Sequence, residues 1–436
     1  MARAPHLLYV AWAFPPARAG GVYRAVATVN AFAEAGWSVT VLTADRAAFE
    51  RFTGVDESLE AQVHPSVSVR RVPFSWPVRE TDIATYSALR AYLPPVWRRQ
   101  RAWRDQVPFP EVGYGPWRRP LERAALDVHA QRPVDLVLAT ANPHVTFAAA
   151  AAVHRSAGVP YVMDYRDAWT LDVFSGERLA SPRSRTARWE RRLQARAAEV
   201  WFVNEPIRAW HAREYPDTAG RMHVVANGWD RGTVDDATPG AALAPRRFGY
   251  LGTVTPKVPL AELVAGWRTA VEEGLVDADA TLTVAGYLGY FSAPQPEMLA
   301  AVESHVDVGV RYVGPVPKTE VASFYADVDV LVLALGAGRY VTSGKVFEYL
   351  ATGKPIVSVH DPRNAAGSIL EGYPLWARTP TLSVDDVAAA LGEGARLAGS
   401  ATEEDRAAAR RHAERYRRDL QLEPRVAALT ELVGAP

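Results

Sequence analysis

One short segment in the C-terminal half concentrates residue types that bind anions and hydroxyl groups. Ser343, Gly344 and Lys345 bring a hydroxyl, free backbone amides and a cation together. The apolar periodicity that starts at Val346 places them at a helix N-terminus, which favours anions. Glu348 follows one turn later, where a carboxylate can accept hydrogen bonds from the two hydroxyls of a ribose. A capping serine and a surface glutamate are the structural alternative.

A second cation lies in a strand-to-helix loop. The apolar run Phe248–Leu251 predicts a strand that ends in Gly252 and Thr253. Lys257 then precedes the next helical stretch, so a lysine and free backbone amides meet at the carboxyl end of a strand. Such a site suits a diphosphate. An ordinary loop with a solvated lysine is the alternative.

Glycines and charged residues also follow predicted strands in the N-terminal half. Gly20 and Gly21 lie between the first apolar run and a helical stretch, where backbone amides can approach a phosphate or a sugar. The pattern is not G-x-G-x-x-G, so the dinucleotide-binding fingerprint is absent. Arg166 and Asp167 follow another strand, and Asp167 could bind or deprotonate a hydroxyl. An ion pair of Arg166 with Asp164 or Asp167 that only holds the loop is the alternative.

Short apolar runs alternate with amphipathic stretches along most of the chain, a pattern typical of parallel sheets with crossover helices. The N-terminal half predicts strands at 7–13, 38–43, 134–140, 160–164, 200–204 and 222–226, and helices at 22–35, 145–156 and 183–198. The C-terminal half predicts strands at 248–251, 280–285, 328–335 and 355–359, and helices at 260–273, 319–326 and 346–352. Ligands of such sheets bind outside the carboxyl ends of the strands, where the candidate residues lie.

A turn-rich stretch from 235 to 245 separates the two series of elements. We therefore predict an α/β protein with two Rossmann-like, doubly wound domains, 1–235 and 245–415, that face each other across a cleft. The residues from 416 to 436 are predicted to form a helix that packs back on the N-terminal domain.

The segment 75–131 interrupts the N-terminal domain and is rich in Trp, Pro and Arg. The interpretation we favour is a solvated helical face whose tryptophans pack on the sheet. A basic and aromatic stretch within the segment, 97–119, could instead contact a membrane interface or an anionic partner.

Composition excludes several classes of function. The chain has 436 residues, and its 49 Lys and Arg balance 49 Asp and Glu, which argues against a nucleic-acid partner. It has no cysteine, which excludes disulfides and thiolate metal sites, and its histidines lack ligand spacing. No apolar run reaches the roughly 18–20 residues that span a bilayer. Because Pro15 and Pro16 follow the short first apolar run, we expect a strand there rather than a signal peptide, and a cytoplasmic protein, peripheral at the inner membrane face if the basic segment contacts lipid.

The ordered set of motifs resembles glycosyltransferase family 4, in a bacterial branch. The motifs are Asn227–Asp230, the Gly252 loop with Lys257, and Ser343–Pro355. The first half is similar to the N-terminal signature of that branch in the Pro-Pro and Gly-Gly opening, in 141–144 and in 158–170. The resemblance covers nearly the whole chain and implies a retaining transferase with the GT-B fold.

The resemblance implies a role for each matching position. The donor, a nucleotide diphosphate sugar with UDP favoured, would be bound by Gly20, Gly21, Gly252, Thr253, Val316, Tyr340, Ser343, Gly344, Val346 and Glu348. The catalytic positions would be His144 at the transferred sugar, Asp167, and Lys257 and Lys345 at the diphosphate. Arg166 and Trp169 would lie on the side of the acceptor, which could be a lipid carrier, a polysaccharide or a natural product. The family needs no metal and no cofactor, since the nucleotide sugar is a substrate.

Two positions depart from the family pattern. Tyr340 stands where the family often has a glutamate that touches the donor sugar, and Thr253 stands where it often has an arginine. These departures leave open a catalytically inactive scaffold that supports another transferase. A nucleotide-sugar epimerase is a weaker alternative, because the carboxylate-rich acid and base set it needs is not found.

Overall fold

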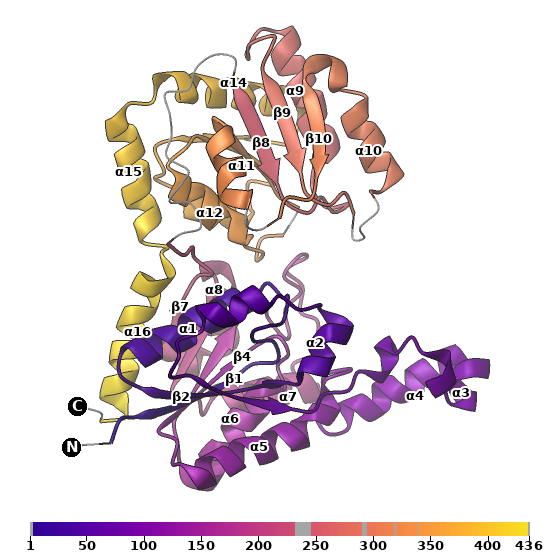
Figure 1. Cartoon of the computed structure of the whole chain (residues 1–436), viewed down its shortest axis with the longest axis vertical. Helices are drawn as coiled ribbons and strands as arrows, with labels where there is room; N and C mark the ends of the chain where they lie inside the picture. The colour runs from indigo at the N-terminus through magenta and orange to yellow at the C-terminus, as the bar shows by residue number, and fades with distance from the viewer. Residues whose placement is uncertain (1–2, 232–245, 290–293, 318–319, 337, 435–436) are drawn as a thin grey trace. The chain divides into compact units, whose positions relative to one another are not determined.

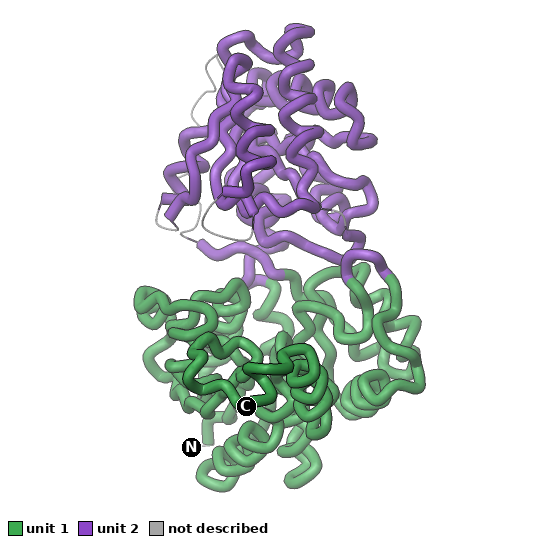
Figure 2. Tube along the Cα trace, turned by 90° about the vertical axis from the view of Figure 1, so that its right-hand side faces the viewer, with its two compact units in different colours: residues 1–172, 177–226, 421–436 green, residues 173–176, 227–420 purple. Residues whose placement is uncertain are grey.

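The computed structural model describes residues 3–231, 246–289, 294–317, 320–336 and 338–434. The predicted linker, 235–245, lies outside the described residues. The chain forms two compact units (Figure 2). Unit 1 comprises 1–172, 177–226 and 421–436, and unit 2 comprises 173–176 and 227–420.

Unit 1 is built on a seven-stranded parallel sheet of order β3-β2-β1-β4-β5-β6-β7. Its strands are β1 (His6–Val10), β2 (Ser38–Ala44), β3 (Ser68–Val72), β4 (Leu136–Thr140), β5 (Tyr161–Tyr165), β6 (Glu199–Phe202) and β7 (Met222–Val224). Its α-helices are α1 (Val22–Glu34), α2 (Arg46–Phe52), α3 (Ala88–Tyr92), α4 (Pro94–Gln106), α5 (Arg118–Gln131), α6 (Thr146–Ala157), α7 (Arg185–Gln194) and α8 (Glu205–Glu214). Figure 1 shows α1 on one face of this sheet and α5 and α6 on the other. The central strands β1, β4 and β5 are buried along their whole length, as expected of a sheet covered on both faces.

Unit 2 is built on a six-stranded parallel sheet of order β10-β9-β8-β11-β12-β13. Its strands are β8 (Arg247–Leu251), β9 (Thr281–Ala285), β10 (Val310–Gly314), β11 (Val330–Ala334), β12 (Ile356–Val359) and β13 (Trp376–Arg378). Its helices are α9 (Leu260–Glu272), α10 (Pro296–Glu303), α11 (Val321–Asp327), α12 (Gly344–Thr352), α13 (Ala365–Leu370), α14 (Val384–Ser400) and α15 (Glu403–Glu414). The last helix, α16 (Arg418–Leu432), begins in unit 2 and continues into unit 1.

The prediction of two doubly wound α/β sheets is confirmed. In unit 1 the strand order reverses at β1 and β4, and in unit 2 it reverses at β8 and β11, the arrangement that opens a ligand crevice at the carboxyl ends. All the predicted elements are present with ends that shift by a few residues, although residue 319, where one helix was predicted to begin, is not described. The edge strands β3 and β10 and the short β13 were missed. Because β3 and β10 are half exposed, neither shows the continuous apolar run of a buried strand.

A buried ion pair joins four elements of unit 1. The Arg24 guanidinium, on α1, bonds both carboxylate oxygens of Asp164 at 2.6 and 3.0 Å, and both side chains are at most 5% exposed. Arg24 also donates to the carbonyls of Val225 and Ala226, which follow β7. Thr140, at the end of β4, donates to the same carboxylate at 2.8 Å. The pair therefore fixes the carboxyl ends of β4 and β5 against α1.

We predict that Arg24→Met lowers the free energy of unfolding by about 3–5 kcal/mol, because it leaves the Asp164 carboxylate buried without its cation. The exposed pair of Arg396 and Glu393 provides the control, since Arg396→Met should change stability little. Urea denaturation of both variants measures the difference. Equal stabilities of the two variants would contradict the structural importance of the buried pair.

Candidate functional site

Two loops at the carboxyl edge of the unit 2 sheet lie in direct backbone contact. Gly252, after β8, donates its N–H to the carbonyl of Ala285 at 2.9 Å. Gly286, after β9, has φ of +125°, and a Cβ atom there would lie 1.9 Å from the Gly252 carbonyl oxygen. Only glycine fits this position, so the contact fixes the course of the Gly252 loop. Thr253 follows on the exposed surface.

Lys257 lies in the turn between β8 and α9 and is exposed. Its Nζ atom lies 3.4 Å from the centre of the Phe174 ring, within unit 2. A cation–π contact at an exposed site is weak, about 0.5–1 kcal/mol, so a phosphate can compete for this ammonium group. The predicted cation therefore lies beyond the carboxyl end of β8, held weakly by an aromatic ring.

The N-terminus of α12 carries the predicted anion-binding segment. The Ser343 side chain accepts from the N–H of Lys345 at 3.3 Å and caps the helix. Gly344 is exposed, so the backbone at the helix start is open to solvent. The side chain of Val346 is fully buried, which leaves only its backbone for a ligand.

Glu348 is held in place by two donors. Tyr325, on α11, donates its hydroxyl to Oε2 at 2.6 Å, and the Lys345 ammonium lies 3.4 Å from the same oxygen. Burial and the neighbouring carboxylate raise the pKa of the Tyr325 hydroxyl well above its usual range, so the hydroxyl stays protonated. Both contacts use Oε2, and the side chain of Glu348 is 28% exposed. The carboxylate is thus oriented and still accessible.

Lys354, the last lysine of the motif Ser343–Pro355, has a structural role. Its ammonium donates to the carbonyls of Tyr325, Ala326 and Val328, at the end of α11, and the residue is 3% exposed. Burial lowers the pKa of Lys354 to about 8. Lys354 therefore positions α11, and through it Tyr325 and Glu348.

Tyr340, one of the two departures from the family pattern, packs against the short segment 173–176. Its N–H donates to the carbonyl of Val173 at 3.4 Å, and a Cβ atom on Gly176 would lie 3.0 Å from its ring. The side chain is 7% exposed. This position therefore packs on a neighbouring loop. Val316 lies beyond the end of β10 and is half-buried.

In unit 1, the Arg166 side chain lies against the glycine pair. Arg166 Nε donates to the carbonyl of Ala141 at 2.7 Å, and a Cβ atom on Gly21 would lie 1.1 Å from its guanidinium. Gly20 is exposed beside it. The structural alternative named Asp164 as a partner of Arg166, but Asp164 pairs with Arg24 instead. Gly21 is thus required for the close approach of a cation.

His144 is oriented by a residue from the inserted segment. Glu111 accepts from the backbone N–H groups of His144 and Val145 at 2.9 and 2.8 Å, and lies 3.2 Å from His144 Nδ1. The imidazole stacks on Trp169 with ring centres 5.0 Å apart, and Trp169 stacks on Phe109 at the same distance. The ring position is therefore fixed on one side by a carboxylate and on one face by Trp169, which Phe109 supports in turn.

Asp167 is exposed and accepts from the Asn142 side chain at 2.7 Å. Its carbonyl oxygen lies 3.4 Å from His144 Nε2. Buried hydrogen bonds hold the loop after β5 that contains Asp167. Thr170 of this loop and Tyr215 donate to the fully buried carboxylate of Glu190 at 2.5 and 2.8 Å. Unit 1 therefore brings His144, Arg166, Asp167 and Trp169 to one edge of its sheet.

Several contributing residues were missed by the sequence analysis. Glu111 and Phe109 come from the insertion, and Tyr325 and Phe174 come from unremarkable stretches of sequence. Arg24 lies in a predicted helical stretch, and an arginine within an apolar periodicity is the one signal there that indicates a buried partner. No local pattern marks the others, because their contacts join residues far apart in the chain.

Metal-ligating side chains are scattered in the described residues, where no three His, Asp or Glu side chains come close enough to hold an ion. Asp329, part of a D-x-D sequence, pairs with Arg247 at 3.2 Å. Among the helices of the described part of the chain, none is both long and apolar enough to cross a membrane.

Two protein-family models match the chain, one in the N-terminal half and one in the C-terminal half. Residues 19–228 match the family model described as "Glycosyl transferase 4-like domain", and residues 245–393 match the model "Glycosyl transferases group 1". A search of curated protein sequences gives no match.

The chain is also similar to solved structures at low sequence identity. These include a glycosyltransferase from Rickettsia africae, with a TM-score of 0.68, 10% identity and coverage of 99% of both chains. The lipopolysaccharide outer core galactosyltransferase WaaB has a TM-score of 0.58 at 12% identity, with 98% of this chain and 99% of WaaB covered. A putative UDP-N-acetylglucosamine 2-epimerase from Listeria monocytogenes has a TM-score of 0.59 at 12% sequence identity, with 99% of this chain and 97% of the epimerase covered. At these identities the likeness supports the fold alone.

We predict that Glu111→Ala lowers the free energy of unfolding by about 1–3 kcal/mol, because it leaves backbone donors at the start of α6 without their acceptor. Asp127→Ala, an exposed change on α5, is the matched control. Urea denaturation measures both. A loss no larger in Glu111→Ala than in the control would contradict the role assigned to Glu111.

Proposed function

The chain belongs to the glycosyltransferases of the family 4 type and has their GT-B fold, and on this premise we propose that it transfers a sugar from a nucleoside diphosphate sugar with retention of anomeric configuration and without a metal ion. The observation that carries the proposal is the cradle at the carboxyl edge of unit 2, where Lys257, the Gly252 loop and the N-terminus of α12 gather. This family membership favours an active enzyme over the inactive scaffold that Tyr340 and Thr253 left open.

The donor is expected on unit 2, with its diphosphate at the cradle. Backbone amides of the Gly252 loop and of Gly344 can donate to phosphate oxygens, and the ammonium groups of Lys257 and Lys345 can balance their charge. These groups are placed before the reaction, so they stabilise the charge that develops on the departing diphosphate. A fixed set of cations and amides can supply the charge stabilisation that a metal ion supplies in other transferases, which supports metal independence.

Glu348 is suited to the ribose of the donor. Its carboxylate is oriented by Tyr325 and remains partly exposed, so it can accept from the 2′ and 3′ hydroxyls. The nucleobase would lie at the backbone near Val316. Uracil is the base we favour, since the structurally similar epimerase from Listeria monocytogenes is named for a UDP-sugar.

The acceptor is expected on unit 1, where Asp167, Arg166 and Trp169 share the edge that carries His144. Glu111 engages Nδ1 of His144, and Nε2 lies 3.4 Å from the carbonyl oxygen of Asp167, a long contact that a sugar hydroxyl would replace in the role that the family resemblance gives His144. A sugar on a lipid carrier, a polysaccharide end or a small natural product all offer the hydroxyl that this edge needs.

In the proposed reaction the bond between the anomeric carbon and the β-phosphate oxygen breaks as the acceptor oxygen bonds to that carbon on the same face. The acceptor proton passes to the departing phosphate oxygen. Configuration is therefore retained, and the coupling constant of the anomeric proton in the product distinguishes this outcome from inversion.

Lys257→Ala is expected to lower turnover of the donor about 100- to 1,000-fold, because it removes a cation that acts on the leaving group. Transfer or slow hydrolysis of the nucleotide sugar, followed by release of the nucleoside diphosphate, gives the rate. Arg311→Ala removes an exposed arginine on β10 and should leave the rate unchanged. A normal rate in Lys257→Ala would refute the diphosphate assignment.

Glu348→Ala should weaken binding of the nucleoside diphosphate roughly 10- to 100-fold, because hydrogen bonds to a charged acceptor contribute about 1.5–3 kcal/mol. The wild-type protein should also prefer the ribonucleotide over its 2′-deoxy form, and the variant should lose that preference. Glu371→Ala, an exposed change beyond α13, is the control. A variant that still discriminates against the deoxynucleotide would exclude the ribose role of Glu348.

A further inference from the structure

A cavity of about 500 Å³ opens in unit 1 where the end of α4 meets the starts of α5 and α7. Each residue that lines it is either an arginine or an apolar residue: Trp103, Arg104, Val107, Pro108, Pro116, Arg118, Arg119 and Arg185. Seven of the eight lining residues belong to the stretch 97–119, for which contact with a membrane or an anionic partner was one of two interpretations, and Arg185 comes from α7. None of the roles proposed above for the two sheet edges uses it.

Hydrogen bonds to main-chain carbonyls build the walls of this cavity. Arg185, at the start of α7, donates to the carbonyl of Gln106 at 2.6 Å and also to that of Val107. Arg118 donates to the carbonyl of Pro108 at 2.8 Å, and its guanidinium lies 4.9 Å from the centre of the Trp189 ring. These contacts fix the loop that follows α4, so the cavity is a defined feature of unit 1.

The cavity is strongly positive. Four arginines line it, and no aspartate or glutamate does. Arg118 is partly neutralised by Glu122 at 2.9 Å. In the part of the chain that the structure describes, the guanidinium groups of Arg104 and Arg119 make no ion pair or hydrogen bond, and both residues are exposed. Such a site is suited to an anion with several acceptor oxygens, such as a phosphate.

An exposed apolar stripe leads along α4 to the cavity. Val96, Trp103 and Val107 are spaced by seven and four residues, so they share one face of the helix, and they are 53%, 67% and 50% exposed. The opposite face is where Arg101 and Asp105 pair at 2.7 Å. These three apolar side chains therefore face solvent, with the exposed Arg99 and Gln100 between Val96 and Trp103 on the same side of the helix.

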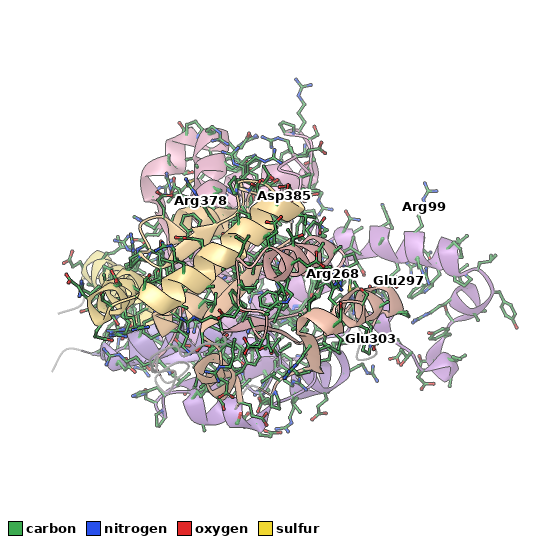
Figure 3. The ribbon with its side chains drawn as sticks, turned by 90° about the horizontal axis from the view of Figure 1, so that it is seen from above. Arg99, Arg268, Glu297, Glu303, Arg378 and Asp385 are labelled. Carbon is green, nitrogen blue, oxygen red and sulfur yellow. The ribbon has the colours of Figure 1, made fainter. Side chains whose placement is uncertain are left out.

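Further exposed apolar residues and an arginine lie close to the stripe in the chain. α3 and α4 extend away from the body of unit 1 (Figure 1), and Tyr92 and Leu93, at their junction, are 84% and 53% exposed. Arg99 points from α4 away from the rest of the ribbon (Figure 3). Exposed aliphatic and aromatic side chains flanked by arginines are typical of helices that lie in a membrane interface.

We propose that this cavity binds the phosphate of an anionic membrane lipid, with the stripe of Val96, Trp103 and Val107 seated among the acyl chains. The arginines recognise the phosphate, and the stripe accounts for the apolar part of the same molecule. A free phosphate would use only the arginines and would leave the stripe in water, so a bilayer lipid fits the two features together. The proposal is independent of glycosyl transfer, because it rests on a different part of unit 1.

The test is flotation of the full chain with vesicles of phosphatidylcholine alone and of phosphatidylcholine mixed with phosphatidylglycerol. The wild-type protein should float with the mixed vesicles and much less with phosphatidylcholine. Arg104→Gln combined with Arg119→Gln should weaken this binding roughly 25-fold, at about five-fold for each arginine near an anionic surface. Trp103→Ser should weaken it about ten-fold without changing the net charge.

Arg98→Gln combined with Arg123→Gln is the matched control, because it removes the same charge from α4 and α5 at exposed positions outside the cavity. This control should retain more binding than the cavity variant. Equal losses in both double variants would overturn the cavity as a specific site and leave only a diffuse attraction between charges. No flotation of the wild type with either vesicle would overturn the membrane proposal itself.

Glycerol 3-phosphate provides the last arm of the test. At the same concentration as the lipid headgroups it should not compete with the vesicles, since it lacks the acyl chains that the stripe requires. Strong competition, or binding of glycerol 3-phosphate in the absence of vesicle binding, would assign the cavity to a soluble phosphate compound and contradict the proposal.

Discussion

Parallel strands bring all of their carboxyl ends to one edge of a sheet, and this constraint places almost every candidate residue of the protein. In unit 2 it gathers the Gly252 loop, Lys257 and the N-terminus of α12 around the β8 and β11 switch point. In unit 1 it gathers Gly21, His144 and the loop after β5. Residues far apart in the chain thus become neighbours because each follows a strand of the same sheet.

Close contacts then convert this shared edge into a fixed arrangement. Gly286 lets two loops touch through their backbones, and Gly21 lets the Arg166 guanidinium lie where a side chain would otherwise be. Buried acceptors hold the surrounding elements, as Asp164 does for α1 and Glu190 does for the loop after β5. In unit 2 such contacts fix groups that are proposed to face the diphosphate, and in unit 1 they fix the edge proposed for the acceptor.

The sequence predicts the central elements well because a strand buried on both faces must be apolar along its whole length. β3 and β10 escaped prediction, since an edge strand with exposed residues lacks that run. At the site, Lys257, Ser343 and Glu348 could be predicted because their types and their places after strands suffice. Glu111 and Tyr325 could not, because each acts through a tertiary contact with a residue more than twenty positions away. Lys354 belongs to the same sequence motif as Ser343 and Glu348, but its ammonium group is buried among three carbonyls. It is therefore a positioning residue.

The most direct test of the account is calorimetric titration of the whole chain with UDP, TDP, GDP and ADP in the presence of a metal chelator. We expect one nucleotide to bind at a single site with the chelator present, because lysines and backbone amides balance the diphosphate charge. Binding that requires a divalent ion, or no binding of any nucleoside diphosphate, would contradict the assignment of the unit 2 cradle.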